Sequence, residues 1–412
     1  MHWRDTNLGK ICDEVQGLIQ TGPFGSQLHE SDYSVEGAPV VMPKDIIGGE
    51  IETSSIARIS KSHADRLKKH KLKAGDIVYG RRGDIGRQAL IGDEQAGWLC
   101  GTGCLRISLG DTIINPGFLH YYLQEKSVIR WITNHAVGAT MPNLNTAILR
   151  SVPIRMPEIT YQRDIAIALS AYDNLIRNNL KRIKILERVA QQIYTEWFVR
   201  FRFPGYEKVK MIGSGTDFGK VPEGWNVENL SELVDFVRGV EPGSSNYKSS
   251  PGLGLVPFLR VGDLGSRNSK IFVERSIVGN KLISREDIVI TMDGTVGRVA
   301  IGLDGAYSTG IRKLVIIDKR LKREYLYFLM LSDNIQNLIN SHAKGTTILH
   351  ASESIRYMKF ILPNEEAMTS FSIFVKPIID EMLVLKEKTG NLSKTRDLLI
   401  PQLVTGKLEV KI

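Results

Sequence analysis

The chain has 412 residues, of which 42% are hydrophobic and 24% charged, and its formal net charge is +9. A chain of this length and composition can bury ordinary hydrophobic cores, and it is long enough for roughly two to four domains. No apolar run approaches the ~18 residues of a membrane span, and the N-terminal residues lack the apolar stretch of a signal peptide, so we expect a soluble, cytoplasmic protein. The basic excess is mild and spread along the chain, and it permits a polyanionic partner without requiring one.

The cysteines exclude a disulfide framework and a zinc cluster. They are few and unpaired in spacing: Cys12, Cys100 and Cys104. Cys100 and Cys104 have no second ligand pair that would complete a zinc site. We therefore expect buried thiols in a reducing compartment and no bound metal.

Residues 1–157 have the texture of an α+β domain. Short apolar runs such as "APVVMP", "DIVYG" and "LRISL" are broken by Gly and Pro, which is typical of short strands joined by turns. Helices are predicted within "SKSHADRLKKHKL" and "PGFLHYYLQEKSVIRWI", where Pro116 suits a first helical turn.

An internal repeat divides the chain. The phrase "GDIVYGRRGDIGR" at 75–87 returns as "EDIVITMDGTVGR" at 286–298, displaced by 211 positions. Two shorter echoes pair His135, Ala136, Gly138 and Thr140 with His342, Ala343, Gly345 and Thr347, and Asp13, Val15 and Gly17 with Asp235, Val237 and Gly239. Repeats of this size are whole domains, so the sequence indicates a duplication of about half its length.

A heptad pattern follows each copy. Spacings of four and three alternate through Ile165, Leu169, Tyr172, Ile176, Asn179, Ile183, Leu186, Ala190, Ile193 and Trp197. The same spacings return in Phe371, Val375, Ile378, Met382, Leu385, Thr389, Leu392, Arg396, Leu399 and Leu403. The first pattern predicts a helix of roughly 50 Å that Pro204 and Gly205 end. A long helix with an apolar stripe needs a packing partner, and the simplest partner for each helix is the other.

We expect the two helices to be antiparallel, because a duplicated unit that folds back on itself gives a pseudo-two-fold arrangement. In that register, facing residue numbers add up to about 568, so Asn179 faces Thr389 and Tyr172 faces Arg396. The alternative is that Thr389 and Arg396 mark an exposed, frayed stretch.

The predicted fold is therefore α+β, with two tandem homologous domains separated by two long antiparallel coiled-coil helices in a pseudo-two-fold arrangement. The predicted segments are a first domain at 1–157, a first helix at 158–203, a second domain at 204–363, and a second helix with a C-terminal tail at 364–412.

The sequence offers no catalytic constellation. A methyltransferase would show a Gly-rich cofactor loop and an (Asn/Asp)-Pro-Pro-aromatic pocket, and neither is present. "GSGTDFGK" at Gly213 has the wrong spacing for a phosphate loop and is interpreted as a flexible linker. No pair of histidines has metal-ligand spacing, and the repeated His135 and His342 are explained by duplication at a helix-to-loop junction.

The repeated turn carries arginines suited to nucleic acid. In the first copy Gly80, Gly83 and Gly86 allow tight turns, while Arg81, Arg82 and Arg87 lie in or beside them. The forked donors of arginine match phosphate oxygens and the O6/N7 edge of guanine. In the second copy Arg87 returns as Arg298, but Met292 and Asp293 replace the other two arginines. Residues kept between the copies suggest scaffold or phosphate contact, and residues that differ suggest base reading.

Three stretches resemble a known family. These are "EWFVRFRFPGYE" at Glu196, "GPFGSQL" at Gly22 and "LLIPQLVTGKLEV" at Leu398, and they are similar to the DNA-specificity subunit of type I restriction-modification systems. The resemblance covers the whole chain in order, although "GPFGS" has no clear copy in the second half, where "RGVEPGSSNY" stands at Arg238.

This resemblance implies a non-catalytic protein that reads a split double-stranded DNA target and binds methylation and restriction subunits. S-adenosylmethionine, ATP and Mg are then expected on those partners, none in this chain, and no membrane partner is expected. Trp197 and Phe198 are expected to be core or docking residues. Two other interpretations stay open: a coiled-coil scaffold without nucleic-acid affinity, and a degenerate DNA methyltransferase or nuclease.

DNA contacts are expected from loop residues of both domains. In the first domain they are Thr21, Phe24, Ser26, Gln27, Lys44, Arg81, Arg82, Arg87 and Thr140. In the second they are Lys248, Arg260, Arg267, Arg298, Lys344 and Thr346.

Overall fold

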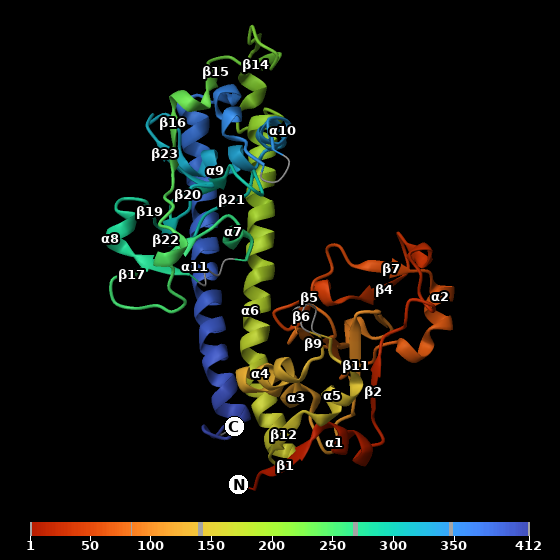
Figure 1. Ribbon diagram of the computed structural model, residues 1–412. Coiled ribbons are helices and arrows are strands. Elements are labelled where there is room, and N and C mark those ends of the chain that lie inside the picture. Colours follow the sequence, from red (N-terminus) through yellow and green to blue (C-terminus); the bar gives the residue numbers. More distant parts are fainter. Residues whose placement is uncertain (1, 84, 139–142, 267–270, 346–348, 411–412) are drawn as a thin grey trace. The chain divides into compact units, whose positions relative to one another are not determined.

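The computed structural model describes residues 2–83, 85–138, 143–266, 271–345 and 349–410 (Figure 1). It divides into two compact units, of which unit 1 is Met1–Ile176 with Asn391–Ile412 and unit 2 is Arg177–Gly390. This division passes through both long helices, so each unit contains one stretch of each helix. The domain boundaries proposed from the sequence, which give each long helix a segment of its own, therefore stay a prediction.

Unit 1 is built on two four-stranded sheets and two short strand pairs. The first sheet is antiparallel, in the order β2 (Leu18–Thr21), β11 (Cys104–Ser108), β8 (Ile77–Gly80) and β9 (Gln88–Leu90). The second has the order β10 (Leu99–Cys100), β4 (Ala38–Val41), β7 (Ala57–Ile59) and β3 (Tyr33–Ser34), with β10 parallel to β4. The pairs are β1 (Arg4–Asn7) with β12 (Pro153–Met156), and β5 (Ile46–Ile47) with β6 (Glu50–Ile51).

Five short helices complete the module of unit 1. They are α1 (Leu8–Glu14), α2 (Lys61–Arg66), α3 (Pro116–Tyr122), α4 (Lys126–His135) and α5 (Thr146–Ser151). The start of α3 follows from its sequence, because the Asn115 side chain accepts the Phe118 N–H at 3.0 Å and Pro116 occupies the first turn. Cys12, Cys100 and Cys104 are buried free thiols, as predicted.

Unit 2 repeats the first sheet strand for strand and the parallel strand pair of the second. Its first sheet is β16 (Val234–Arg238), β23 (Ile311–Ile316), β20 (Ile288–Thr291) and β21 (Val299–Ala300), and its second is β18 (Phe272–Glu274), β17 (Leu255–Leu259), β22 (Gly305–Tyr307) and β19 (Leu282–Ile283). β17 is parallel to β22 as β4 is to β10, and β15 (Asn226–Asn229) pairs with β24 (Lys359–Leu362) as β1 does with β12. The helices of this module are α7 (Asp263–Ser266), α8 (Arg275–Val278), α9 (Arg323–Leu331) and α10 (Asp333–Ser341). The predicted duplication is confirmed.

The strand in the repeated phrase is buried on both faces, which explains why its apolar run is unbroken. In β8, Ile77 and Tyr79 pack in the core that includes the helices, whereas Val78 between them packs with residues of the second sheet. Val289 of β20 has the same position, with its two neighbours in the helical core of unit 2. Successive side chains of a strand point to opposite faces, so a strand between two layers has no polar face.

The strand register corrects one of the predicted echoes. Thr21 lies opposite Leu105 in the first sheet, and Arg238 lies opposite Arg312 in its counterpart, so the glycines that follow, Gly22 and Gly239, correspond. A Cβ on Gly22 would lie 1.9 Å from the Gly101 carbonyl oxygen, and one on Gly239 would lie 2.2 Å from that of Tyr307. The pairing of Asp13, Val15 and Gly17 with Asp235, Val237 and Gly239 was wrong, because the first set lies at and beyond the end of α1 and the second along β16 and just after it.

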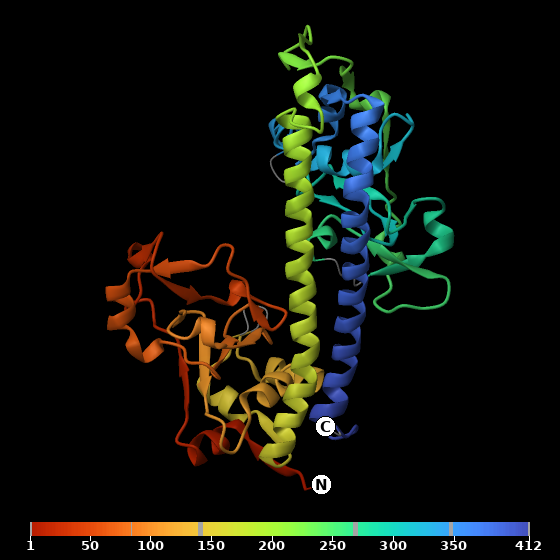
Figure 2. The ribbon, with the colours of Figure 1, turned by 180° about the vertical axis from the view of Figure 1, so that it is seen from behind.

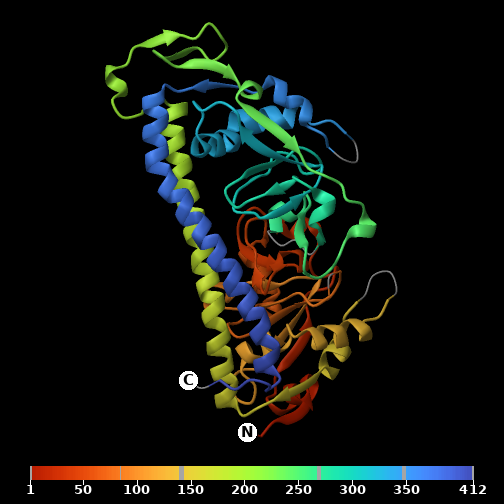
Figure 3. The same ribbon diagram turned by 90° about the vertical axis from the view of Figure 1, so that its left-hand side faces the viewer.

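Two long helices, α6 (Ile159–Tyr194) and α11 (Glu365–Val404), run side by side in both units (Figures 1, 2 and 3). In unit 1 the Arg396 guanidinium lies 2.6 Å from the Asp173 carboxylate, and the Val410 N–H donates to the Tyr161 hydroxyl at 2.8 Å. The earlier residue of α6, Tyr161, thus contacts the later residue of the second segment, Val410, and Asp173 contacts the earlier Arg396. In unit 2, Ile183 packs with Met382 and Leu385 in the same sense. The predicted antiparallel direction is confirmed.

The heptad seam is buried along both helices, and two of its polar residues have hydrogen-bond or ion-pair partners. All twenty seam positions are buried or half-buried. The Thr389 hydroxyl donates to the Leu385 carbonyl of its own helix at 2.7 Å. Arg396 pairs with Asp173 and Asp397 rather than with Tyr172. Both residues are within α11, so neither marks a frayed end.

The end of α6 differs from the prediction. The α-helix stops at Tyr194 and continues as a π-helical turn, Thr195–Val199, so it ends before Pro204. The turn directs Phe198 into an aromatic cluster with Tyr325 and Phe371, whose ring centroids each lie 4.8 Å away. "GSGTDFGK" is also not a free linker. It closes an exposed hairpin of β13 (Met211–Gly213) and β14 (Lys220–Pro222), in which Gly215 and Gly219 have positive φ.

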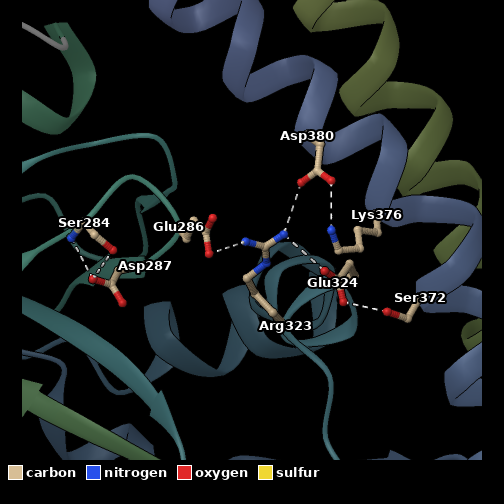
Figure 4. A network of polar contacts seen from close by, with 8 residues as sticks. All are labelled: Ser284, Glu286, Asp287, Arg323, Glu324, Ser372, Lys376 and Asp380. Carbon is tan, nitrogen blue, oxygen red and sulfur yellow. Dashed lines mark hydrogen bonds and ion pairs between the residues drawn. The ribbon is translucent and has the colours of Figure 1, made fainter.

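Unit 2 carries a polar network between its module and α11 (Figure 4). The Arg323 guanidinium at the start of α9 lies 3.2 Å from Glu324 and 3.5 Å from Asp380 of α11. Glu324 is only 5% exposed, and it also accepts the Ser372 hydroxyl at 2.8 Å. A buried carboxylate needs such partners, so the network holds α9 against α11.

Replacing Arg323 should weaken unit 2. In Arg323→Ala the buried Glu324 loses its cation, and we expect the free energy of unfolding to fall by about 1–3 kcal/mol. Urea unfolding of the full chain measures the change. Lys376→Ala is the matched control, because Lys376 is exposed and pairs only with Asp380, so its loss should cost less than about 0.5 kcal/mol. Equal effects of the two variants would contradict this role of Arg323.

Candidate DNA interface

Loops that are distant in sequence converge at one end of the two sheets of unit 1. The Gly22 N–H donates to the Cys104 carbonyl, the Gly101 N–H to that of Val41, and the Arg81 N–H to that of Gly103, each at 2.9 Å. The segments after β2, β4, β8 and β10 therefore form one surface. It contains most of the residues predicted to contact DNA in the first domain.

The turn after β8 requires glycine at two positions. Gly83 and Gly86 have φ of 81° and 111°, and their counterparts Gly294 and Gly297 have φ of 72° and 81°. Residues other than glycine rarely adopt such positive φ angles. The repeated glycines therefore shape the turn that presents the neighbouring arginines.

The loop after β2 presents an exposed aromatic ring beside polar groups. Phe24 is 55% exposed, and its N–H donates to the Gln27 side-chain oxygen at 3.2 Å. Thr21 is half-buried at the end of β2, and Ser26 is exposed. Lys44 is exposed in the neighbouring turn Pro43–Asp45, where the Asp45 carboxylate accepts the Met42 N–H.

The three arginines of the first turn differ in their surroundings. Arg81 is half-buried, and its Nε donates to Asn143 Oδ1 at 3.1 Å. Burial lowers the pKa of Arg81, and the neighbouring charge of Arg82 lowers it further. Arg82 is exposed, whereas Arg87 is half-buried at the far side of the turn, where its carbonyl accepts the Gly80 N–H at 2.7 Å. Thr140 lies outside the described residues.

The corresponding surface of unit 2 pairs some of its cations with carboxylates. Arg260, Lys344 and Arg298 are exposed, but Arg260 lies 3.7 Å from Asp263 and Lys344 lies 3.0 Å from Glu353. Lys248 is exposed and forms a backbone bridge to Phe272. Arg267 and Thr346 lie outside the described residues. All the residues proposed for DNA contact in either domain stay a prediction.

Three residues of these surfaces were missed from the sequence: Asn143, His350 and Arg238. Asn143 bridges to Arg82, as His350 of unit 2 bridges to Asp293. Arg238 is exposed at the end of β16, opposite the buried Arg312, whose pKa is lowered by burial. The available signal was that Arg238 precedes Gly239 as Thr21 precedes Gly22, but only the strand register shows that these glycines correspond.

A buried histidine supports the strand that follows Arg87. Nδ1 of His120 lies 3.0 Å from Gln88 Oε1, and its Nε2 lies 2.9 Å from the Gln124 amide nitrogen. The amide nitrogen is a donor, so Nε2 accepts and Nδ1–H donates to Gln88. The ring is neutral because burial lowers the pKa of His120 to about 4; the charge of Asp173 raises this pKa slightly, and that of Arg396 lowers it.

Acid should destabilise unit 1 through His120. The unfolded imidazole titrates near pH 6.5, whereas the folded one titrates near 4, so the unfolded state alone binds a proton between these values. The titration of His120 thus leaves the free energy of unfolding unchanged above about pH 6.5. It lowers this free energy as the pH drops towards 4, by at most about 3 kcal/mol. Buried His70, whose pKa burial also lowers, contributes in the same direction.

Urea unfolding between about pH 4.5 and 7 measures this effect. His120→Asn keeps an amide donor towards Gln88 and should flatten the pH dependence, whereas the same change at exposed His135 should not. Equal slopes for wild type and His120→Asn would contradict the assignment.

The geometry defines a class of protein: a duplicated α+β module with cationic loop ends, each copy packed on an antiparallel helix pair. In the described part of the chain, no group of three or more His, Cys, Asp or Glu side chains could hold a metal ion. Among the same residues, no helix is long and apolar enough to span a membrane.

The family model for the type I restriction modification DNA specificity domain matches the chain twice, at residues 26–188 and 222–389. The chain belongs to this family. Each match covers most of one module together with part or most of the long helix that follows it.

Curated relatives are named as type I specificity subunits, and the similarity covers most of this chain and most of each relative. The chain is 25% identical to the type I restriction enzyme MjaIX specificity subunit of Methanocaldococcus jannaschii, over 99% of this chain and 97% of the relative. It is 23% identical to the HindI specificity subunit of Haemophilus influenzae, over 82% and 88% of the two chains. Among solved structures, a type I S subunit from M. genitalium matches 100% of this chain and 97% of its own with a TM-score of 0.57 at 15% identity, a likeness of fold.

Proposed function

We propose that the chain acts as the non-catalytic DNA specificity subunit of a type I restriction-modification complex and reads a DNA target in two separated parts, one with each unit. The observation that carries the proposal is the duplication of the loop surface. The same strand ends and glycine turns occur in both units, and Arg87 beside the first turn returns as Arg298 beside the second. Major-groove readers with repeated modules recognise split targets in this way.

Methylation subunits are proposed to dock on the long helices, and restriction subunits on the assembled complex. Both helices expose large apolar side chains away from the seam: Ile167, Leu175, Ile185, Ile373, Phe374 and Leu398. Exposed apolar side chains of this kind can be buried by a protein partner. S-adenosylmethionine, ATP and Mg are then proposed to bind the partners.

Loss of the repeated arginine should weaken DNA binding in both halves. Arg87→Ala and Arg298→Ala, made together in the assembled complex, are expected to lower affinity for all DNA sequences and to reduce the salt dependence of binding by about one per arginine. Titration of labelled duplex at several salt concentrations measures both effects.

Lys10→Ala with Lys319→Ala is the matched control. Both lysines are exposed, Lys10 on α1 and Lys319 beyond the end of β23 that is far from the loops, and the pair removes the same charge. Unchanged affinity of the double arginine variant would favour a scaffold without nucleic-acid affinity at these loops.

The helix pair is proposed to set the distance between the two half-sites. Deleting 176–182 and 386–392 removes seven facing residues from each helix and preserves the heptad phase. Each helix shortens by about 10 Å, so the preferred gap should shorten by roughly three base pairs. Methylation of a duplex series with graded gaps measures the preference.

A deletion of 176–182 alone is the control, because it shifts the seam register and should abolish assembly. An unchanged gap preference in the double deletion would remove the spacing role.

A further inference from the structure

We propose that Arg81 is a pre-oriented guanine reader in unit 1 and that unit 2 has no guanine reader at the matching position. The two halves of the target then differ in base content at this point. The inference rests on the proposed function and assigns one side chain to one base.

The backbone of Arg81 is held on both sides. Its N–H donates to the Gly103 carbonyl at 2.9 Å, and its own carbonyl accepts the Leu144 N–H at 2.9 Å. The residue therefore leaves the end of β8 in one direction, towards the surface formed by the converging loops.

The side chain is held as well, but only by its inner part. Nε donates to Asn143 Oδ1 at 3.1 Å, and the guanidinium carbon lies 6.0 Å from the centroid of the Phe24 ring. Within the described residues, Nη1 and Nη2 of Arg81 make no hydrogen bond or ion pair. Two parallel donors are therefore available, and their plane is fixed by a hydrogen bond and an aromatic neighbour.

Buried Arg106 shows the contrast. Its Nε lies 2.7 Å from the Asp76 carboxylate, and its Nη atoms donate to the Lys69 carbonyl and the Ser108 hydroxyl. All its nitrogens are used within the fold, which is typical of a structural arginine.

A fixed fork suits a base edge better than a phosphate. Guanine offers O6 and N7 side by side in the major groove, and a bidentate arginine is their commonest partner. A phosphate can be contacted by an exposed cation whose orientation is not fixed. Arg82 and Lys44 are exposed beside Arg81 and could make such contacts.

Unit 2 keeps the backbone geometry and changes the chemistry. The Met292 N–H donates to the Gly310 carbonyl at 2.8 Å, and the Met292 carbonyl accepts the Ala351 N–H at 2.9 Å, so Met292 stands where Arg81 stands. Met292 is fully buried, and the next residue, Asp293, lies 2.7 Å from the His350 ring. A carboxylate accepts hydrogen bonds and cannot bind guanine O6 or N7, which are also acceptors.

Unit 2 also has no ring at the position that corresponds to Phe24. Where unit 1 has Phe24, the loop after β16 has Glu241, whose carboxylate accepts the Tyr247 hydroxyl at 2.7 Å. Unit 2 thus has a buried methionine at the position of Arg81 and carboxylates at those of Arg82 and Phe24.

The test uses the full chain assembled with its methylation subunits and a duplex library randomised in both half-sites. Arg81→Met introduces the residue of unit 2, and Arg81→Lys keeps the charge without the fork. Both are expected to lose a guanine preference at one position of one half-site, to leave the other half-site unchanged, and to bind the wild-type target about 10- to 100-fold more weakly. Asn143→Ala, which frees Nε, should relax the same position less strongly.

Arg82→Met is the control and should weaken binding equally for all sequences. If Arg81→Met likewise weakens binding equally for all sequences and the complex keeps its guanine preference, Arg81 is a phosphate contact and the inference is overturned. If the wild-type complex selects no sequence at all, the proposed function itself fails. Near-wild-type urea unfolding of Arg81→Lys confirms that lost selectivity does not reflect a misfolded module.

Discussion

The apolar seam between α6 and α11 is the constraint on which the rest of the structure depends. Neither helix can remain alone in water with a continuous apolar stripe, and each finds the other in reverse direction. Each unit consequently combines the start of one helix with the end of the other. Unit 1 joins Met1–Ile176 to Asn391–Ile412 for this reason, and Ile400, Leu403 and Val404 complete a core that belongs to the first module.

The two modules share a scaffold and differ at their loop ends. Asp76 pairs with Arg106 in the first sheet, and Asp287 pairs with Lys313 at the corresponding place in unit 2. These ion pairs and the glycine turns are kept because they hold the strand that leads into the loops. The residues beyond that strand carry different donors and acceptors, which is what two readers of unlike half-sites require.

Much of the architecture follows from sequence patterns, and the errors share one cause. The repeated phrase, the heptad seam and its direction were predicted because their signals are periodic or internally duplicated. The echo that paired Asp13 with Asp235 was wrong, the hairpin at Met211–Pro222 was interpreted as a linker, and the ion pair of Arg396 with Asp173 was not predicted. Each depends on which strand or side chain lies beside another in the fold. A short match between two stretches of sequence does not contain this information. The role of Asn143 was missed because it is 62 residues from Arg81.

By itself the sequence determined the duplication, the long antiparallel helices, the buried thiols and the set of basic loop residues from which contacts could come. Composition and periodicity suffice for these, since burial and helical packing depend on residue type and spacing. Only the tertiary structure decided that Gly22 matches Gly239, that Arg81 and Met292 share one backbone position, and that Asn143 and Phe24 flank a single guanidinium. These relations arise from strand register and long-range hydrogen bonds, which join residues that no local pattern connects.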